Sequence, residues 1–327
     1  KELELRAEAG QHAAVFAMLD DFPSDGVAGE ILQVVKEKSE EYRSAATQRE
    51  ELLKKFGDLL AKIKDEPTRQ RLAPFHQELL ADLNMNTLDR LSAFRQHADD
   101  EDLLPDERVA QAVSGWLIGS NSATENLPVT ISLFEVRQMI REYVNTIDAL
   151  ARARIIEQLR SQEGAAVSYA AKIIALMKPT LDTPPAEKEK PGYYELEVKG
   201  LNRAKSIQYL VQLPPEYDPR RHYPTILALH RQRSDATRQL DWWAGPWQES
   251  GWRAGQASRH GYIVVAPNWA EKGQRKYEYS DREHAAVLYC LKDAFRRFSI
   301  DTDRVFLAGH SMGGDAAWDI GLAHPDL

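Results

Sequence analysis

The chain has a single cysteine, and this scarcity excludes two kinds of site. Cys290 is the one thiol among 327 residues, so no disulfide forms within the chain and no cysteine-rich metal centre can be built. It falls in a helical pattern over residues 285–298, where a small apolar side chain serves packing. We expect neither a metal nor another cofactor.

Long apolar runs and an excess of positive charge are also missing. No run approaches the roughly 20 residues of a transmembrane helix, so we expect a soluble chain without a membrane span. Lys and Arg number 42 against 50 Asp and Glu, and residues 1–180 hold 22 basic and 30 acidic side chains. Nucleic-acid binding needs clustered positive charge, so no such partner is expected. The chain starts at Lys1, which leaves any targeting peptide outside it, and compartment and oligomeric state stay open.

A proline-rich segment over residues 179–192 separates two halves of the chain that differ in the periodicity of their apolar residues. It contains four prolines interleaved with Glu and Lys, a composition that a helix does not tolerate and a core does not bury. Upstream, apolar residues recur at three- and four-residue spacing, as in residues 52–63 and 133–147, which is typical of amphipathic helices. No fixed repeat period is present. We predict a helical domain over residues 1–180, an irregular bundle of six or seven helices, and a linker over residues 181–192.

Residues 193–327 have the patterns of strands. Alternating apolar residues in 194–198 and 207–213, with a glycine-containing turn between them, predict an antiparallel hairpin. The short continuous apolar runs 225–229 and 262–266 suit strands that are covered on both faces.

Helical segments lie between and after these strands. Ser280 and Glu283 form a capping-box signature ahead of an amphipathic segment that reaches Phe298. Alternation of strand and helix predicts a mostly parallel sheet with crossover helices. The expected fold class is therefore α/β, with an N-terminal all-helical domain followed by a partial α/β domain over residues 193–327.

The most informative motif lies close to the end of the chain. Gly309-His310-Ser311-Met312-Gly313 follows four apolar residues, Val305 to Ala308, and leads into a helical pattern. A serine with glycine two residues away on each side can occupy a cramped turn that exposes its hydroxyl, which is the geometry of a nucleophile elbow. A glycine-rich turn with an incidental serine is the simpler interpretation, but the strand, turn and helix order favours the elbow.

On these residues the chain resembles the α/β-hydrolase superfamily. Among its branches it is similar to the catalytic domains of esterases, poly(hydroxyalkanoate) depolymerases and prolyl-oligopeptidase-type peptidases. The resemblance covers roughly residues 191–327. Besides the elbow, it rests on residues 209–217, 223–230 and 300–305.

The resemblance implies roles for particular residues. Ser311 would be the nucleophile, and the backbone N–H of Met312 would donate to the developing oxyanion. The second donor would be the N–H of Arg231 or Gln232, in the loop after the strand that ends at His230. Families of this kind usually have glycine after that histidine, and this chain has arginine instead.

The resemblance places the catalytic acid and base after the elbow, where only sixteen residues follow Ser311. We therefore expect the triad aspartate and histidine to lie outside the chain, which would be truncated after the elbow. An unpaired apolar edge at residues 305–308 is an aggregation hazard and supports this expectation. The upstream residues His230, His260 and His284 would need an unusual arrangement to act as the base.

Aromatic residues near the ends of strands are candidates for substrate binding. Trp269 and His230 fall at the carboxyl ends of strands, where ligands of open α/β sheets bind. A tryptophan-rich segment after the strand 225–229 suits stacking on sugar or aromatic acyl groups, or packing of a crossover helix on the sheet. Its members are Trp242, Trp243, Trp247 and Trp252.

The implied reaction is acyl transfer from a small-molecule or peptide substrate through an acyl-enzyme on Ser311. Esters are the expected substrates, ahead of peptides. The alternative is a non-catalytic scaffold or interaction protein with a degenerate hydrolase module, which the arginine after His230 favours.

Overall fold

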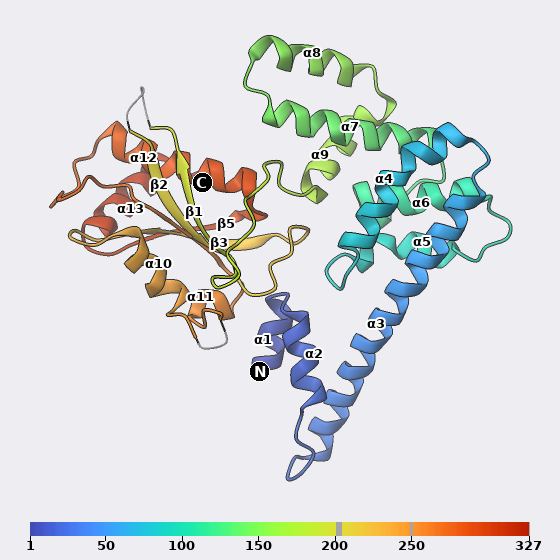
Figure 1. The fold of residues 1–327 in the computed structure, drawn as a ribbon, viewed down its shortest axis with the longest axis horizontal. Coiled ribbons are helices and arrows are strands. Elements are labelled where there is room, and N and C mark those ends of the chain that lie inside the picture. Colours follow the sequence, from blue (N-terminus) through green and yellow to red (C-terminus); the bar gives the residue numbers. More distant parts are fainter. Residues whose placement is uncertain (201–204, 249–250, 327) are drawn as a thin grey trace. The chain divides into compact units, whose positions relative to one another are not determined.

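The computed structural model describes residues 1–200, 205–248 and 251–326, and the chain forms two compact units (Figure 1). One unit, here called the α/β unit, combines Lys1–Met18 with Leu181–Leu327, and the other, the helical unit, is Leu19–Thr180. The later boundary between the units lies between Thr180 and Leu181, and the first 18 residues group with the α/β unit. No helix in the described part of the chain is long and apolar enough to cross a bilayer.

The helical unit is built around the buried helix α6 (Pro105–Ile118), ten of whose residues are buried. Helices α3, α5, α7 and α9 contact it, and Phe75 and Trp116 meet edge to face in the core at 6.4 Å. Residues 1–180, all of them described, contain nine α-helices rather than six or seven, because short helices do not span enough turns to show a periodicity. They are α1 (Glu2–Glu8), α2 (His12–Asp20), α3 (Gly29–Lys62), α4 (Glu66–Asp82), α5 (Ser92–His97), α6, α7 (Leu127–Asn145), α8 (Ala149–Arg160) and α9 (Val167–Leu176), with 3-10 turns at Leu88–Leu91, Ser120–Ser122 and Glu163–Ala165.

The sheet of the α/β unit has five strands in the order β1-β2-β4-β3-β5 among the described residues. The predicted hairpin of β1 (Tyr193–Val198) and β2 (Ile207–Gln212) is confirmed, and β2 also runs antiparallel to β4 (Ile263–Pro267). Strand β3 (Tyr223–Leu229) pairs in parallel with β4 and with β5 (Ile300–Gly309). The sheet is more mixed than expected because β4 inserts beside β2 and so has one antiparallel neighbour.

Helices cover both faces of this sheet. On one face α10 (Ala236–Ala244) and α11 (Gln256–Arg259) bury small apolar side chains against β2, β3 and β4. On the other face lie α12 (Asp281–Arg297) and α13 (Met312–Ala323). The capping box predicted for α12 is present, and Cys290 is buried on this helix, where burial raises the pKa of its thiol. This thiol therefore packs in the core, as the sequence predicted.

Helices α1 and α2 are attached to the α/β unit by polar anchors. Gln11 is fully buried and its side-chain amide donates to the carbonyl of Ser258 at 3.0 Å. The Glu216 carboxylate accepts from the N–H groups of Ala13 and Ala14, at 2.7 and 2.9 Å, in the first turn of α2. A carboxylate at the N-terminus of a helix accepts hydrogen bonds from N–H groups that have no partner within the helix, and its negative charge interacts favourably with the positive end of the helix dipole. These contacts explain why the first 18 residues belong to the α/β unit.

Candidate active site

Ser311 occupies the corner between β5 and α13. Its backbone has φ 54° and ψ −126°, a region that a residue with a side chain enters at a cost of about 1–3 kcal/mol. The residue is exposed, whereas its neighbour Met312 is buried. Such strain persists only where the surroundings impose it, and here it presents the serine hydroxyl at the surface of the unit.

The two glycines of the motif are required by close backbone contacts. A Cβ at Gly309 would overlap the carbonyl of Gly313. A Cβ at Gly313 would overlap the carbonyl of Leu229 and lie 2.8 Å from that of His230. The next residue, Gly314, has no such neighbour closer than 3.6 Å. The start of α13 is therefore held directly against the end of β3.

This contact brings the loop after β3 beside the elbow. Leu229 lies opposite Gly309 in the parallel pairing of β3 with β5, so Arg231 and Gln232 follow at the same edge as Ser311. Both side chains are exposed. Within the described chain, the N–H groups of Met312, Arg231 and Gln232 have no hydrogen-bond partner. Because Met312 is the first residue of α13, its N–H also carries the positive end of the helix dipole.

The buried side chains of His230 and Trp269 pack together next to the loop that follows β3. The His230 side chain is buried, its ring lies 5.5 Å from the Trp269 ring, and its Nδ1 is 3.0 Å from the carbonyl of Arg231. Burial lowers the pKa of His230, so its ring is neutral at neutral pH. Trp269 is itself fully buried and packs edge to face on Tyr277 at 6.0 Å. Both residues therefore position the loop.

The tryptophans of α10 do not join this group. Trp242 is 80% exposed on the helix surface. Trp243 is half-buried and lines an apolar cavity of about 400 Å³, shared with Tyr262 and Phe306. That cavity lies on the face of the sheet covered by α10, not on the edge where β3 and β5 end.

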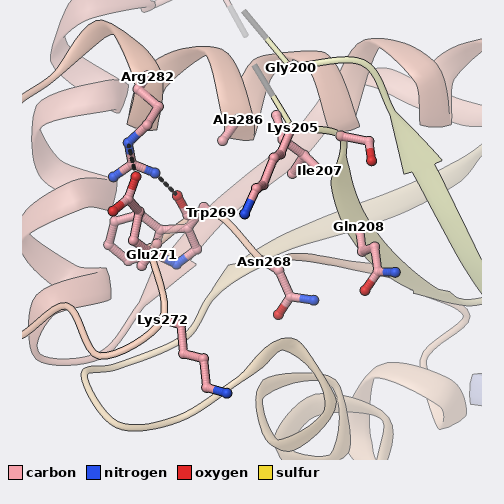
Figure 2. Close-up of a pocket in the computed structure, with 12 residues that line it drawn as sticks. Gly200, Lys205, Ile207, Gln208, Asn268, Trp269, Glu271, Lys272, Arg282 and Ala286 are labelled. Carbon is pink, nitrogen blue, oxygen red and sulfur yellow. Dashed lines mark hydrogen bonds and ion pairs between the residues drawn. The ribbon is translucent and has the colours of Figure 1, made fainter. Parts of the chain in front are cut away.

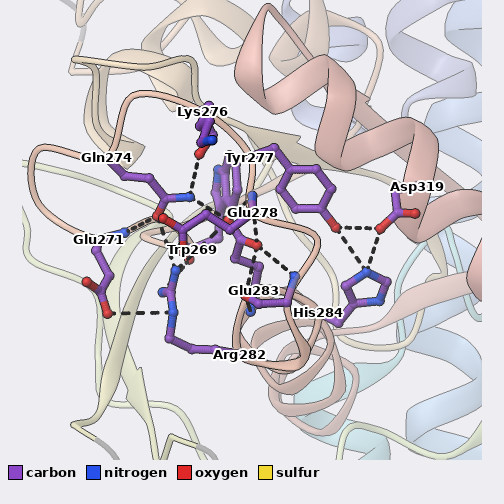
Figure 3. Close-up of polar contacts among 11 residues, drawn as sticks. Trp269, Glu271, Gln274, Lys276, Tyr277, Glu278, Arg282, Glu283, His284 and Asp319 are labelled. Carbon is purple, nitrogen blue, oxygen red and sulfur yellow. Dashed lines mark hydrogen bonds and ion pairs between the residues drawn. The ribbon is translucent and has the colours of Figure 1, made fainter.

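A polar network that no sequence pattern indicated connects α12, α13 and the segment before α12 (Figure 3). The Tyr277 hydroxyl donates to the Asp319 carboxylate at 2.6 Å, and His284 Nε2 lies 2.8 Å from the same oxygen. His284 Nδ1 is 3.3 Å from Nε2 of His324. The hydrogen bonds from Tyr277 and then from His284 lower the pKa of Asp319, so the carboxylate is ionised. These hydrogen bonds link α12 to α13, the helix that begins directly after Ser311.

None of the upstream histidines contacts the nucleophile. His284 is engaged in the network, His230 supports the loop, and His260 lines the apolar cavity on the other face. Among the described residues, no side chain forms a hydrogen bond with Ser311.

A second buried group in this region is the carboxylate of Glu283. It accepts from the N–H and hydroxyl of Ser280, at 3.0 and 2.9 Å, and from the side-chain amide of Gln274 and the N–H of Glu278 (Figure 3). Burial opposes ionisation, but the hydrogen bonds outweigh it and lower the pKa of Glu283 below 4.5. The segment before α12 is thus held in place by hydrogen bonds to the ionised carboxylate of Glu283.

This carboxylate should make the α/β unit sensitive to acid. The pKa of Glu283 is lower in the folded chain than in the unfolded chain. The ionised carboxylate therefore contributes fully to the free energy of unfolding above its ordinary pKa of 4.5, and this contribution is lost as the pH falls through the pKa of the folded chain. We expect Glu283→Gln to lower the free energy of unfolding by about 1–3 kcal/mol at pH 7 and to reduce the further loss of that free energy as the pH falls below about 4.5. Glu278→Gln, an exposed neighbour, is the control and should leave the pH dependence as in the wild type. Equal acid sensitivity of Glu283→Gln and wild type would contradict this.

Comparison with known proteins gives similarity only to solved structures, since no protein-family model and no curated protein matches the chain. A thermostable esterase is 22% identical, with a TM-score of 0.32 over 42% of this chain and 39% of that one. The S-formylglutathione hydrolase of Staphylococcus aureus is 22% identical, with a TM-score of 0.33 over 41% of this chain and 53% of that one. The glucuronoyl esterase from Solibacter usitatus is 17% identical, with a TM-score of 0.25 over 44% and 52%. The chain thus spans 39–53% of the length of these structures.

The order of elements within the chain itself defines the class of fold. Along the chain, a helical domain is followed by an α/β domain in which an antiparallel hairpin precedes parallel strands with crossover helices. A serine on a strained corner follows β5 and opens a helix. This order of elements is that of the α/β-hydrolase fold around its nucleophile elbow.

Proposed function

We propose that the protein is a serine hydrolase that cleaves esters through an acyl-enzyme on Ser311. The observation that carries this proposal is the backbone of Ser311, which is strained, exposed and followed directly by the unpaired N–H of Met312. Backbone strain of this kind is tolerated where the surrounding structure holds a side chain in one fixed orientation. A nucleophile must be held in this way to attack a carbonyl carbon.

In the proposed reaction the Ser311 oxygen attacks the carbonyl carbon of the ester, and its proton passes to a general base. The negative charge that forms on the carbonyl oxygen is stabilised by the N–H of Met312 together with that of Arg231 or Gln232. Each such donor contributes about 3 kcal/mol to lowering the barrier. Collapse of the tetrahedral intermediate breaks the ester C–O bond, and the leaving alcohol takes the proton from the base. Water, which gives a proton to the same base, then attacks the acyl-enzyme, and return of that proton to the serine oxygen releases the acid and restores Ser311.

The base and the acid that orients it are proposed to come from polypeptide outside the 327-residue chain. Supporting this, the described residues offer no hydrogen-bond partner to Ser311, and His284 and His230 form hydrogen bonds elsewhere. Esters are proposed ahead of peptides because an alcohol leaves with less proton donation than an amine requires.

The proposal is tested by labelling the full-length protein with a fluorophosphonate probe, which reacts with activated serines. Wild type should be labelled, and Ser311→Ala should lose labelling completely because the attacking oxygen is removed. Ser161→Ala, an exposed serine that ends α8, is the matched control and should label as wild type does.

A non-catalytic scaffold is the second candidate, favoured by the arginine that follows His230 in place of a glycine. An arginine side chain beside the proposed oxyanion site crowds it or adds charge. Absence of labelling in a folded wild-type protein would reject the hydrolase and support the scaffold.

A further inference from the structure

A cavity of about 770 Å³ opens where β4 ends and β2 begins (Figure 2). It lies at the edge of the sheet from which the nucleophile also projects, and of the residues that line it only Trp269 has been given a role above. The lining residues whose charge or hydrogen-bonding groups bear on ligand binding are Lys205, Asn268, Trp269, Glu271, Lys272 and Arg282.

The strand register places this cavity level with the nucleophile. Val265 of β4 and Leu307 of β5 both lie opposite Leu227 of β3, so the two strands are aligned across the sheet. Asn268 follows three residues after Val265, and Ser311 four residues after Leu307. Two strand spacings of roughly 4.8 Å put the ends of β4 and β5 about 10 Å apart. One substrate of moderate length therefore reaches from Ser311 into the cavity.

The charge of the cavity is positive. Among the described residues that line it, one has a carboxylate, Glu271, and this is paired with the Arg282 guanidinium at 3.6 Å (Figure 2). Lys205 and Lys272 form no ion pair with any described residue. Figure 2 shows Lys205 extending toward Trp269 and Asn268. Two ammonium groups are thus left to attract a negatively charged ligand.

Two neutral donors accompany these charges. Among the described residues, none accepts a hydrogen bond from the indole N–H of Trp269, whose side chain is fully buried. The side-chain oxygen of Asn268 accepts from the N–H of Ala236 at 3.2 Å, which leaves its NH₂ group as a donor. A buried donor without an acceptor is costly, so this cavity suits a ligand that brings acceptor oxygens.

We propose that this cavity binds a carboxylate carried by the substrate, about 10 Å from the ester carbonyl that Ser311 attacks. The proposal rests on ester hydrolysis at Ser311. Ammonium groups and N–H donors bind a carboxylate through charge-assisted hydrogen bonds, whereas a neutral ester in the same place has weaker acceptors. The protein is then selective for half-esters of dicarboxylic acids over neutral diesters of the same length.

The test measures binding to the full-length protein carrying Ser311→Ala, so that no turnover occurs. Calorimetric titration with monomethyl suberate should give a Kd about tenfold lower than with dimethyl suberate. Lys205→Met and Lys272→Met should each weaken the half-ester about fivefold, and the double variant should abolish the preference. Lys292→Met, an exposed lysine of α12 outside the cavity, is the control and should bind as the parent does.

Equal affinities for the two esters, or a preference that survives the double lysine variant, would overturn the carboxylate site. Displacement of the half-ester by inorganic phosphate at equal concentration would overturn the choice of carboxylate in favour of a phosphate ligand. Because binding is measured without the serine hydroxyl, these outcomes are separate from the labelling that tests the nucleophile.

Discussion

Gly313→Ala is expected to slow fluorophosphonate labelling of Ser311 by about 100-fold and to destabilise the α/β unit by about 3 kcal/mol. A methyl group at this position overlaps the carbonyl of Leu229 and lies 2.8 Å from that of His230. Both neighbours are backbone atoms in or directly after β3, which is paired on both sides with β4 and β5, so they cannot move aside as a side chain tip does. The start of α13 must shift instead, and with it the N–H of Met312.

Gly314→Ala is the matched control for this change. It adds the same methyl group one residue later in α13, where the nearest atom is 3.6 Å away. Alanine is favoured over glycine in helices, so this variant should be neutral or more stable by up to about 1 kcal/mol, with unchanged labelling. The measurements are labelling rate and urea unfolding of the full-length protein. Similar losses in both variants would show that general sensitivity of the helix, and not contact with β3, is the cause.

The elbow could be predicted from the sequence because its signature is local. Two glycines, a serine and an apolar run are contiguous, and each constrains the same short turn. The hairpin and the capping box of α12 were predictable for the same reason. In each case the sequence pattern is local, although the contact that requires Gly313, with Leu229 of β3, is not.

The remaining features depend on contacts between distant parts of the chain. The attachment of α1 and α2 rests on Gln11 and on Glu216, more than 200 residues from the N–H groups it holds. The network of Tyr277, His284 and Asp319 joins three elements whose proximity only the fold establishes. Single polar residues of this kind are common in any sequence, so no pattern separates them from solvated ones.

Glu78→Ala is expected to destabilise the helical unit by about 3–5 kcal/mol. Two oxygens of Glu78 on α4 accept from the Arg137 guanidinium of α7, at 2.7 and 2.6 Å, and one also accepts from the indole N–H of Trp116 on α6. The Arg137 side chain is 7% exposed, so removing the carboxylate leaves a buried charge without its partner. The three helices then lose the group that joins them.

The effect should stay within the helical unit. Both ends of that unit join the α/β unit, between residues 18 and 19 and between 180 and 181, and the elbow belongs to the other core. Urea unfolding should therefore show one transition moved to lower urea, while the labelling rate of Ser311 in native buffer stays within about twofold of wild type. Glu157→Ala, which breaks the exposed pair with Arg160, is the control and should change stability by less than about 0.5 kcal/mol. An unchanged unfolding free energy in Glu78→Ala would contradict the buried pair, and a parallel loss of labelling would show that the helical unit contributes to the reactivity of the serine.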